Sequence, residues 1–130
     1  MRLLLDTHIW VRWLSEDQPL GRSVIDQIEQ ADYLAVSAIS CWEVAYLIKN
    51  GKLALSVELD KWIQMALQDS GVEVIKISSE IAITSAMLPD IHRDPADRFI
   101  IATAVTANCM LATYDETIPK YDAISKRIVC

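Results

Sequence analysis

Residues 92–115 constrain the fold of this chain more than any other part of its sequence. Asp94 is of a type favoured as the N-cap of a helix, and Pro95 is favoured at the first helical position. The residues that follow are apolar around most of a helical circumference, which is typical of a helix buried on nearly all sides. An apolar strand at residues 109–112 comes next and leads to Asp115. A buried helix beside a buried strand favours an α/β fold built on a central sheet.

Short apolar strands alternate with helices along the rest of the chain. The first of them, at residues 2–5, has the continuous apolar pattern of a parallel strand buried on both faces. The expected strands are residues 2–5, 33–36, 72–77, 109–112 and 127–130, and the expected helices are residues 7–14, 23–31, 41–49, 57–67, 79–88 and 95–107. This alternation predicts an α/β fold: a mostly parallel sheet with helices on both faces, in a single domain over residues 1–130.

The composition fits a globular domain, since 52% of the 130 residues are apolar. No apolar run reaches the roughly 18 residues that a membrane span needs. Asp6 and His8 interrupt the N-terminal apolar run too early for a signal peptide. The 3 cysteines are widely spaced and form no CxxC pair, which fits a reducing compartment. We therefore expect a cytoplasmic protein that does not enter a membrane.

The formal net charge of −6 argues against binding nucleic acid through a general basic surface. It is compatible with a nuclease whose acids gather at a metal site, because bound cations reverse the local charge. It would also suit binding to a basic segment of a partner protein.

Four acidic residues occupy related positions in the expected fold. Asp6 and Asp115 each follow a strand, Asp97 opens a helix, and Glu43 lies in the first turn of a helix that follows a strand. In a parallel sheet, these positions meet at one edge. Carboxylates held close together repel one another, and oxygen ligands of this kind suit Mg²⁺ or Mn²⁺. The sequence therefore predicts a divalent-metal site made by these four acids.

Some of these residues also have simpler interpretations. Glu43 lies three residues after Ser40, and Asp97 lies three residues after Asp94, so each acid could merely complete a capping box. These alternatives stay open for the individual residues, although they do not explain why the acids recur at one edge of the sheet.

The predicted site favours hydrolysis of a phosphate ester. A bound metal ion lowers the pKa of a water molecule and stabilises the charge that develops on phosphate. The two histidines, His8 and His92, are too few and too far apart to suggest a zinc site, and there is no P-loop. One alternative is an aspartyl-phosphate phosphatase with Asp6 as nucleophile, although such enzymes usually have a second Asp at the position of His8. Another is a non-catalytic binding module, although all four acids are present.

The sequence resembles the PIN-domain ribonucleases, and among them the VapC-type toxins of type II toxin–antitoxin systems. Five matching segments follow one another in the family's order over nearly the whole chain. They are LLLDTHIW (residues 3–10), SAISCWEVA (37–45), NGKL (50–53), HRDPADRFIIATA (92–104) and LATYDE (111–116).

This resemblance implies a three-layer α/β/α PIN-like domain with Mg²⁺- or Mn²⁺-dependent endoribonuclease activity, in which metal-activated water cleaves RNA phosphodiester bonds. It also implies a homodimer and a cognate antitoxin whose tail lies across the active-site groove. The implied catalytic and metal-binding residues are Asp6, Glu43, Asp97 and Asp115, and the implied supporting hydroxyls are Thr7, Ser37 and Thr113.

The chain also departs from the family pattern. Ala96 stands where many relatives have an aromatic residue, and Leu47 stands where many have a basic one. Lys49, the next basic residue, and Arg98 are the two candidates for binding substrate phosphate. Arg98 could equally form a surface ion pair.

Trp10 and Trp13 are three residues apart and share one face of their expected helix. They either belong to the core or form a docking surface for a partner. In the second case, an amphipathic antitoxin helix would cover them and extend a basic side chain to the acids.

Overall fold

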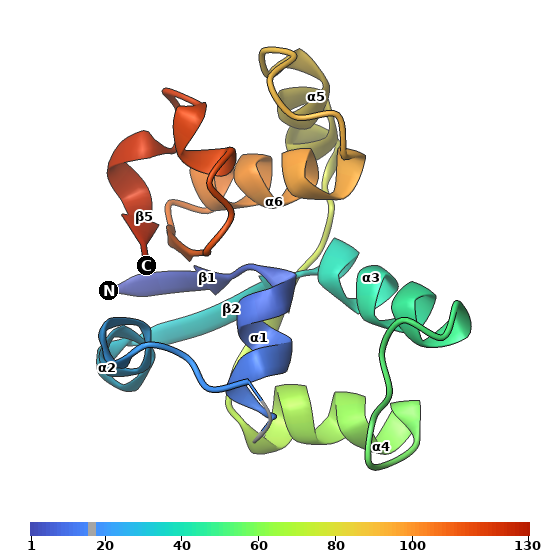
Figure 1. Cartoon of the computed structure of the whole chain (residues 1–130). Coiled ribbons are helices and arrows are strands. Elements are labelled where there is room, and N and C mark those ends of the chain that lie inside the picture. The colour runs from blue at the N-terminus through green and yellow to red at the C-terminus, as the bar shows by residue number, and fades with distance from the viewer. Residues whose placement is uncertain (16–17) are drawn as a thin grey trace.

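Among the residues that the computed structural model describes, 1–15 and 18–130, five strands form one sheet in the order β3-β2-β1-β4-β5 (Figure 1). They are β1 (Arg2–Leu5), β2 (Tyr33–Ser37), β3 (Val72–Ile75), β4 (Met110–Ala112) and β5 (Ile128–Val129). Every pair of neighbouring strands is parallel. In the central strand β1, Leu4 lies opposite Ala35 of β2 and Leu111 of β4. The parallel sheet predicted from the alternating elements is confirmed.

Helices cover both faces of this sheet. They are α1 (Thr7–Trp13), α2 (Arg22–Gln30), α3 (Ala38–Lys49), α4 (Leu59–Gln64), α5 (Ser79–Met87) and α6 (Pro95–Thr106). Leu3 and Leu5 point into one core cluster, and Leu4 points into the other, because successive side chains of a strand point to opposite faces. The first cluster includes Trp10 of α1, and the second includes Ile100 of α6. Three layers result, as expected.

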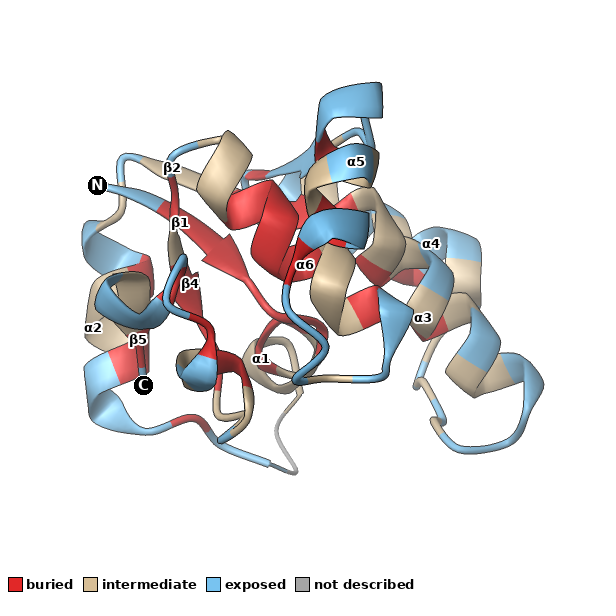
Figure 2. Ribbon diagram, turned by 90° about the horizontal axis from the view of Figure 1, so that it is seen from above, coloured by how far each residue is buried: buried red, intermediate tan, exposed pale blue. Residues whose placement is uncertain are grey.

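Helix α6 is the most buried helix of the fold, as its apolar circumference predicted (Figure 2). Its buried residues are Ala96, Ile100, Ile101, Ala102, Thr103 and Ala104. The helix begins at Pro95, and the side chain of Asp94 accepts a hydrogen bond from the Ala96 N–H at 3.0 Å. Local capping chemistry thus sets the start of α6, which places Asp97 in its first turn.

The start of α3 differs from the expectation. Ser37, and not Ser40, is the N-cap, and its hydroxyl accepts a hydrogen bond from the Ile39 N–H at 3.2 Å. Strand β2 passes directly into α3 without a loop, so the last residue of the strand takes the capping position. Glu43 therefore lies beyond the first turn of α3, and its interpretation as part of a capping box with Ser40 is wrong.

Several other boundaries also shift. The helix expected at residues 57–67 begins at Leu59 as α4 and continues as a π-helical segment, Met65–Asp69. The strand expected at residues 72–77 ends at Ile75, and the one expected at residues 109–112 begins at Met110. Short 3₁₀ turns, Ile118–Lys120 and Ser125–Arg127, lead to β5.

Trp10 is a core residue. Its side chain has no exposed surface, and its indole packs edge-on against Trp62 with ring centroids 4.9 Å apart. Its N–H donates a hydrogen bond to the Ala66 carbonyl at 3.0 Å, so the one polar atom of the ring is satisfied. Trp13 is half-buried against the same cluster. The docking surface that we considered for this pair therefore cannot include Trp10.

The three cysteines are free thiols, and only Cys130 is exposed. Within residues 1–15 and 18–130, no helix combines the length and the apolar character that a membrane span requires.

Candidate active site

Three of the four predicted acids line one pocket at the carboxyl edge of the sheet. Asp6 directly follows β1, Glu43 lies on α3, and Asp97 lies in the first turn of α6. The cavity has a volume of about 260 Å³. Residues more than 90 positions apart in the chain meet here because the strand ends and the starts of the following helices share this edge.

Asp6 is almost fully buried and is held from both sides. Its Oδ1 accepts a hydrogen bond from the Thr7 N–H at 2.8 Å, and its Oδ2 accepts one from Thr113 Oγ1 at 2.7 Å. His8 Nδ1 lies 3.5 Å from the same Oδ2. Burial raises the pKa of Asp6 above its ordinary value, and the charge of Asp115 adds to this, although His8 and the two hydrogen bonds oppose it.

Glu43 is anchored by a hydroxyl of α1. Thr7 Oγ1 donates a hydrogen bond to Glu43 Oε1 at 2.5 Å and lies 2.8 Å from Ser40 Oγ. Burial raises the pKa of Glu43, the hydrogen bond from Thr7 opposes this rise, and the charges of Asp6 and Asp94 add to it. Thr7 therefore contacts Asp6 through its backbone and Glu43 through its side chain.

Asp97 has several charged neighbours that affect its pKa. Burial and the charges of Asp6, Asp94 and Glu43 raise its pKa to about 7, and His92 partly offsets them. Three carboxyl groups with raised pKa values in one pocket form a site that favours a cation. Their oxygen atoms suit Mg²⁺ or Mn²⁺, so the donor set fits the predicted metal.

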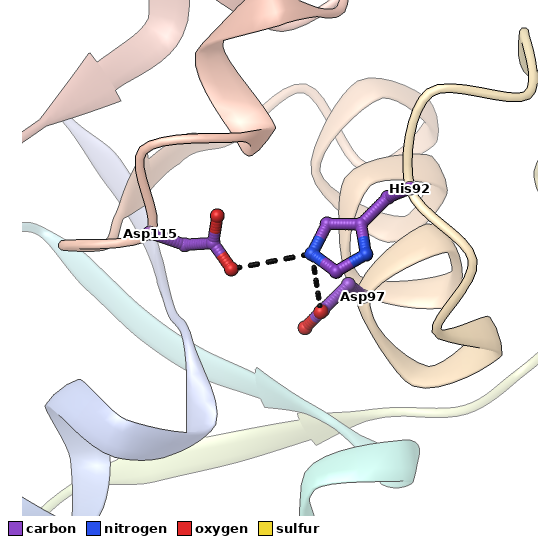
Figure 3. Close-up of side chains that lie close together, drawn as sticks. All are labelled: His92, Asp97 and Asp115. Carbon is purple, nitrogen blue, oxygen red and sulfur yellow. Dashed lines mark hydrogen bonds and ion pairs between the residues drawn. The ribbon is translucent and has the colours of Figure 1, made fainter.

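Asp115 does not line this pocket. Its side chain lies close to those of His92 and Asp97 (Figure 3). Its Oδ2 lies 3.3 Å from His92 Nε2, and its Oδ1 accepts hydrogen bonds from the N–H groups of Thr117 and Ile118 at 2.7 and 3.3 Å. Burial alone would raise the pKa of Asp115, but these hydrogen bonds hold it below its ordinary value. Asp115 thus accepts hydrogen bonds from the start of the 3₁₀ turn Ile118–Lys120 as well as facing the site.

His92 was missed as a site residue by the sequence reasoning. Ligand atoms of His92, Asp97 and Asp115 lie within 4.8 Å of one another, so the imidazole forms part of the acidic cluster (Figure 3). The number and spacing of the two histidines argue only against a zinc site and do not indicate a place beside carboxylates. The available signal was the position of His92, five residues before Asp97 and in the same matching segment.

The three predicted supporting hydroxyls have different positions. Thr113 Oγ1 bridges the site, because it donates to Asp6 and accepts a hydrogen bond from the Asp115 N–H at 3.0 Å. Thr7 holds Glu43, as described above. Ser37 is fully buried as the N-cap of α3, and it does not line the pocket.

Neither predicted phosphate-binding cation lines the acidic pocket. Lys49 is exposed at the last position of α3. The guanidinium of Arg98 faces the end of α5 instead. It donates to the carbonyl groups of Ser85, Ala86, Leu88, Pro89 and His92 at 2.8–3.5 Å. This arrangement gives Arg98 a structural role at the C-terminus of α5, where carbonyl groups need donors.

The cations that line the pocket are Lys52 and Arg12. Gly51 adopts a left-handed backbone, with a φ of 69°, and the Lys52 N–H bonds back to the Leu47 carbonyl at 2.9 Å. This turn reverses the chain after α3 and brings Lys52 to the acids. Arg12 donates to two loop carbonyls, those of Gln18 and Pro19. The NGKL segment was the signal for Lys52, but a turn in sequence does not show which pocket it faces.

Comparison with known proteins agrees with this arrangement. The chain belongs to the PIN-domain family, whose family model matches residues 3–124, and within that family to the VapC-type proteins. It is 36% identical over 117 residues to the curated "Ribonuclease VapC22" of Mycobacterium tuberculosis (strain ATCC 25618 / H37Rv), an alignment that covers 89% of this chain and 88% of the relative.

Solved structures show the same fold at lower identity. A toxin–antitoxin complex from Klebsiella pneumoniae matches with a TM-score of 0.67 and 24% identity, over 98% of this chain and 96% of that one. VapBC2 from Rickettsia felis, bound to a DNA fragment from its promoter, matches with a TM-score of 0.69 and 18% identity, over 95% and 96%.

Proposed function

We propose that this chain is a divalent-metal-dependent endoribonuclease that acts in the cytoplasm as the toxin of a toxin–antitoxin pair. The observation that carries the proposal is the convergence of Asp6, Glu43 and Asp97, three carboxyl groups with raised pKa values, in one pocket. The 36% identity to a curated ribonuclease of the VapC type supports RNA as the substrate.

Asp6 and Asp97 would bind Mg²⁺ or Mn²⁺ directly, and Glu43 would bind it directly or through water. Asp115 would complete the acidic site at its edge. The metal ion would make hydroxide available near neutral pH and stabilise negative charge on the scissile phosphate. The chain's own residues fix the ligands in place, because Thr113 holds Asp6 and Thr7 holds Glu43 by hydrogen bonds.

An RNA phosphate needs a cation near these acids, since the chain as a whole carries a net charge of −6. Lys52 is the best placed, because it lines the pocket and its ammonium forms no ion pair with any carboxylate of the described residues. Lys49 and Arg98 remain predictions from the sequence, and their positions favour them less than Lys52.

The direct test is cleavage of a labelled RNA by the purified protein with Mg²⁺ or Mn²⁺, and with EDTA. EDTA, Asp6→Asn and Asp97→Asn should each abolish cleavage while the circular dichroism spectrum stays that of a folded protein. A folded Asp6→Asn variant that cleaves RNA as fast as the wild type would contradict the proposal.

The two alternative functions predict different experimental results. A binding module without a metal site would show no gain in melting temperature when Mg²⁺ or Mn²⁺ is added. An aspartyl-phosphate phosphatase would trap a fluoroaluminate adduct on Asp6 and would not cleave RNA.

A cognate antitoxin would have a groove available next to the acids. A second cavity, of about 430 Å³, shares Val11 and Leu53 with the acidic pocket. The other apolar residues that line it are Leu14, Ala54, Leu55, Trp62 and Met65. An amphipathic helix would cover this groove with its apolar face and extend a basic side chain to Asp6 and Asp97. Leu53→Asp should then prevent co-purification with a short protein from a neighbouring reading frame.

A homodimer would be held by exposed apolar side chains of α3 and α5. Trp42 and Tyr46 stack with their ring centroids 4.9 Å apart and are 54% and 50% exposed. Ile83 and Met87 are 65% and 78% exposed on α5. Large apolar side chains gathered at a surface are typical of protein interfaces. Trp42→Glu should convert the dimer to a monomer in sedimentation equilibrium.

A further inference from the structure

His92 lies between two of the predicted metal-binding acids, Asp97 and Asp115 (Figure 3). It does not line the acidic pocket itself. Its Nε2 is 2.9 Å from Asp97 Oδ2 and 3.3 Å from Asp115 Oδ2. One ring nitrogen therefore joins the first turn of α6 to the segment that follows β4.

The backbone of His92 is held by residues of the fold and not by the acids. Its N–H donates a hydrogen bond to Tyr121 Oη at 2.6 Å, and Tyr121 is fully buried in the second core cluster. Its carbonyl lies 3.5 Å from Arg98 Nη1, which also donates to the Pro89 carbonyl at 2.9 Å. The loop before α6 is thus fixed, and the ring of His92 is placed before any ligand arrives.

The second ring nitrogen indicates where the proton lies. Nδ1 of His92 faces the N–H of Asp94 at 3.4 Å, so it acts as an acceptor. In a neutral imidazole, the other nitrogen then carries the hydrogen, so Nε2–H donates to Asp115 Oδ2 at 3.3 Å, and Asp97 Oδ2 lies 2.9 Å from the same nitrogen. A metal-ligating imidazole has the opposite arrangement, since its second nitrogen normally donates an N–H to an acceptor. The geometry therefore favours donation by His92 over metal binding by His92.

The carboxylates of Asp115 and Asp97 differ in how many of their oxygen atoms have a partner. Both oxygen atoms of Asp115 accept hydrogen bonds, Oδ1 from backbone N–H groups and Oδ2 from His92. Asp97 Oδ2 lies 2.9 Å from His92 Nε2, whereas Asp97 Oδ1 accepts no hydrogen bond from residues 1–15 or 18–130. That second oxygen is the one left for the pocket that Asp97 shares with Asp6 and Glu43.

We infer that His92 is a positioning residue of the acidic site: its Nε2 lies against both carboxylates, holds Asp97 beside Asp115 and leaves the other oxygen of Asp97 for a metal ion in the pocket. Asp115 acts through this contact and not as a direct ligand. The inference rests on the proposed metal-dependent function, because it assigns His92 and Asp115 their parts in holding that metal.

The first test measures Mn²⁺ binding by electron paramagnetic resonance, without any RNA. His92→Leu removes the donor and should weaken binding by about tenfold or more, as loss of an outer hydrogen-bond partner does at metal sites. His92→Gln keeps an amide N–H in a similar position and should stay within about threefold of the wild type. The matched control is Ile91→Ala, an uncharged change at the preceding exposed residue, which should leave the affinity unchanged.

The second test uses the unaltered protein, so it does not depend on how any variant folds. Two-bond ¹H–¹⁵N spectra of the ¹⁵N-labelled protein report which ring nitrogen carries the hydrogen at a pH that keeps the ring neutral. The inference requires the proton on Nε2 of His92 both before and after Mg²⁺ is added. Transfer of the proton to Nδ1 on adding Mg²⁺ would make His92 a direct ligand and would overturn the positioning role.

The outcomes separate this inference from the proposed function. If the wild type binds neither Mn²⁺ nor Mg²⁺, the metal-dependent function and the inference both fail. If the wild type binds Mn²⁺ and His92→Leu binds it equally well, only the inference fails. If His92→Gln is as weak as His92→Leu, a donated hydrogen bond is not what His92 supplies, and the inference again fails alone.

Discussion

Thr7 Oγ1 donates a hydrogen bond to Glu43 Oε1 at 2.5 Å, so the first residue of α1 holds a carboxylate of α3. Thr7→Val keeps the shape of the side chain but removes this donor, and Glu43 would then be free to turn away from Asp6. We expect Mn²⁺ affinity to fall by about tenfold, as for other outer-shell hydrogen bonds at metal sites. Metal titration followed by electron paramagnetic resonance measures the change.

Thr7→Ser is the matched control for this contact, because it retains the hydroxyl and loses only a methyl group. It should bind Mn²⁺ like the wild type. If Thr7→Val bound Mn²⁺ as tightly as the wild type, the hydrogen bond from Thr7 would not be what positions Glu43.

The raised pKa of Asp97 makes the stability of the metal-free protein depend on pH. The pKa of Asp97 is about 7 in the folded chain and 3.8 as its ordinary value, so the folded state retains the proton longer. Between these two values the folded state binds more protons than the unfolded state, and the free energy of unfolding must fall as pH rises. The melting temperature in EDTA should therefore drop from pH 5 to pH 7, and Asp97→Asn should flatten that slope.

At pH 8, where Asp97 is charged, Asp97→Asn should stabilise the metal-free protein. Since solvent screens a partly exposed group, we expect only about 1 kcal/mol, or roughly 4 °C in melting temperature. The same variant should lose the stabilisation by Mg²⁺ that the wild type shows. A wild-type melting temperature in EDTA that rises between pH 5 and pH 7 would rule out this electrostatic account.

We predict different effects on RNA binding for substitutions at Lys52 and at Lys49. Lys52 lines the acidic pocket, whereas Lys49, the last residue of α3, does not. Lys52→Gln should raise the KM for RNA by about fivefold to tenfold with little change in kcat, because it removes one phosphate contact. Lys49→Gln is the matched control and should leave both constants unchanged. The reverse result would restore Lys49 as the phosphate-binding residue.

Arg98 should matter for stability and not for cleavage chemistry. Its guanidinium donates to several carbonyl groups at the end of α5, and its side chain is 12% exposed. Arg98→Gln should lower the free energy of unfolding by about 1–2 kcal/mol in urea denaturation, because partly buried carbonyls would lose a charged donor. Arg93→Gln, at an exposed position of the same loop, should change it by less than about 0.5 kcal/mol. A stable Arg98→Gln variant with a raised KM would favour phosphate binding instead.

Local rules accounted for the parts of the fold that depend on neighbouring residues. Asp94 and Pro95 set the start of α6 because a cap and a first-turn proline act within a few residues. The same rules could not choose between Ser37 and Ser40, since both are good caps, and the choice depended on where β2 ends.

The acids of the site were predictable for a similar reason. A parallel sheet brings its strand ends and helix starts to one edge, so the convergence of Asp6, Glu43 and Asp97 follows from the order of the elements. Their partners did not follow from that order. Lys52 reaches the pocket only because Gly51 reverses the chain, and His92 reaches Asp97 because Tyr121 and Arg98 hold its loop.

By itself, the sequence determined the α/β class, the single parallel sheet and the acids at its edge. These features depend on strand periodicity, helix caps and the order of elements, which are set by residues close together in the chain. Only the tertiary structure decided that Trp10 is core and that Asp115 faces His92. It also decided that Arg98 stabilises α5 while Lys52 lines the pocket. These outcomes depend on the directions in which side chains from distant segments point, and those directions are fixed by packing between layers.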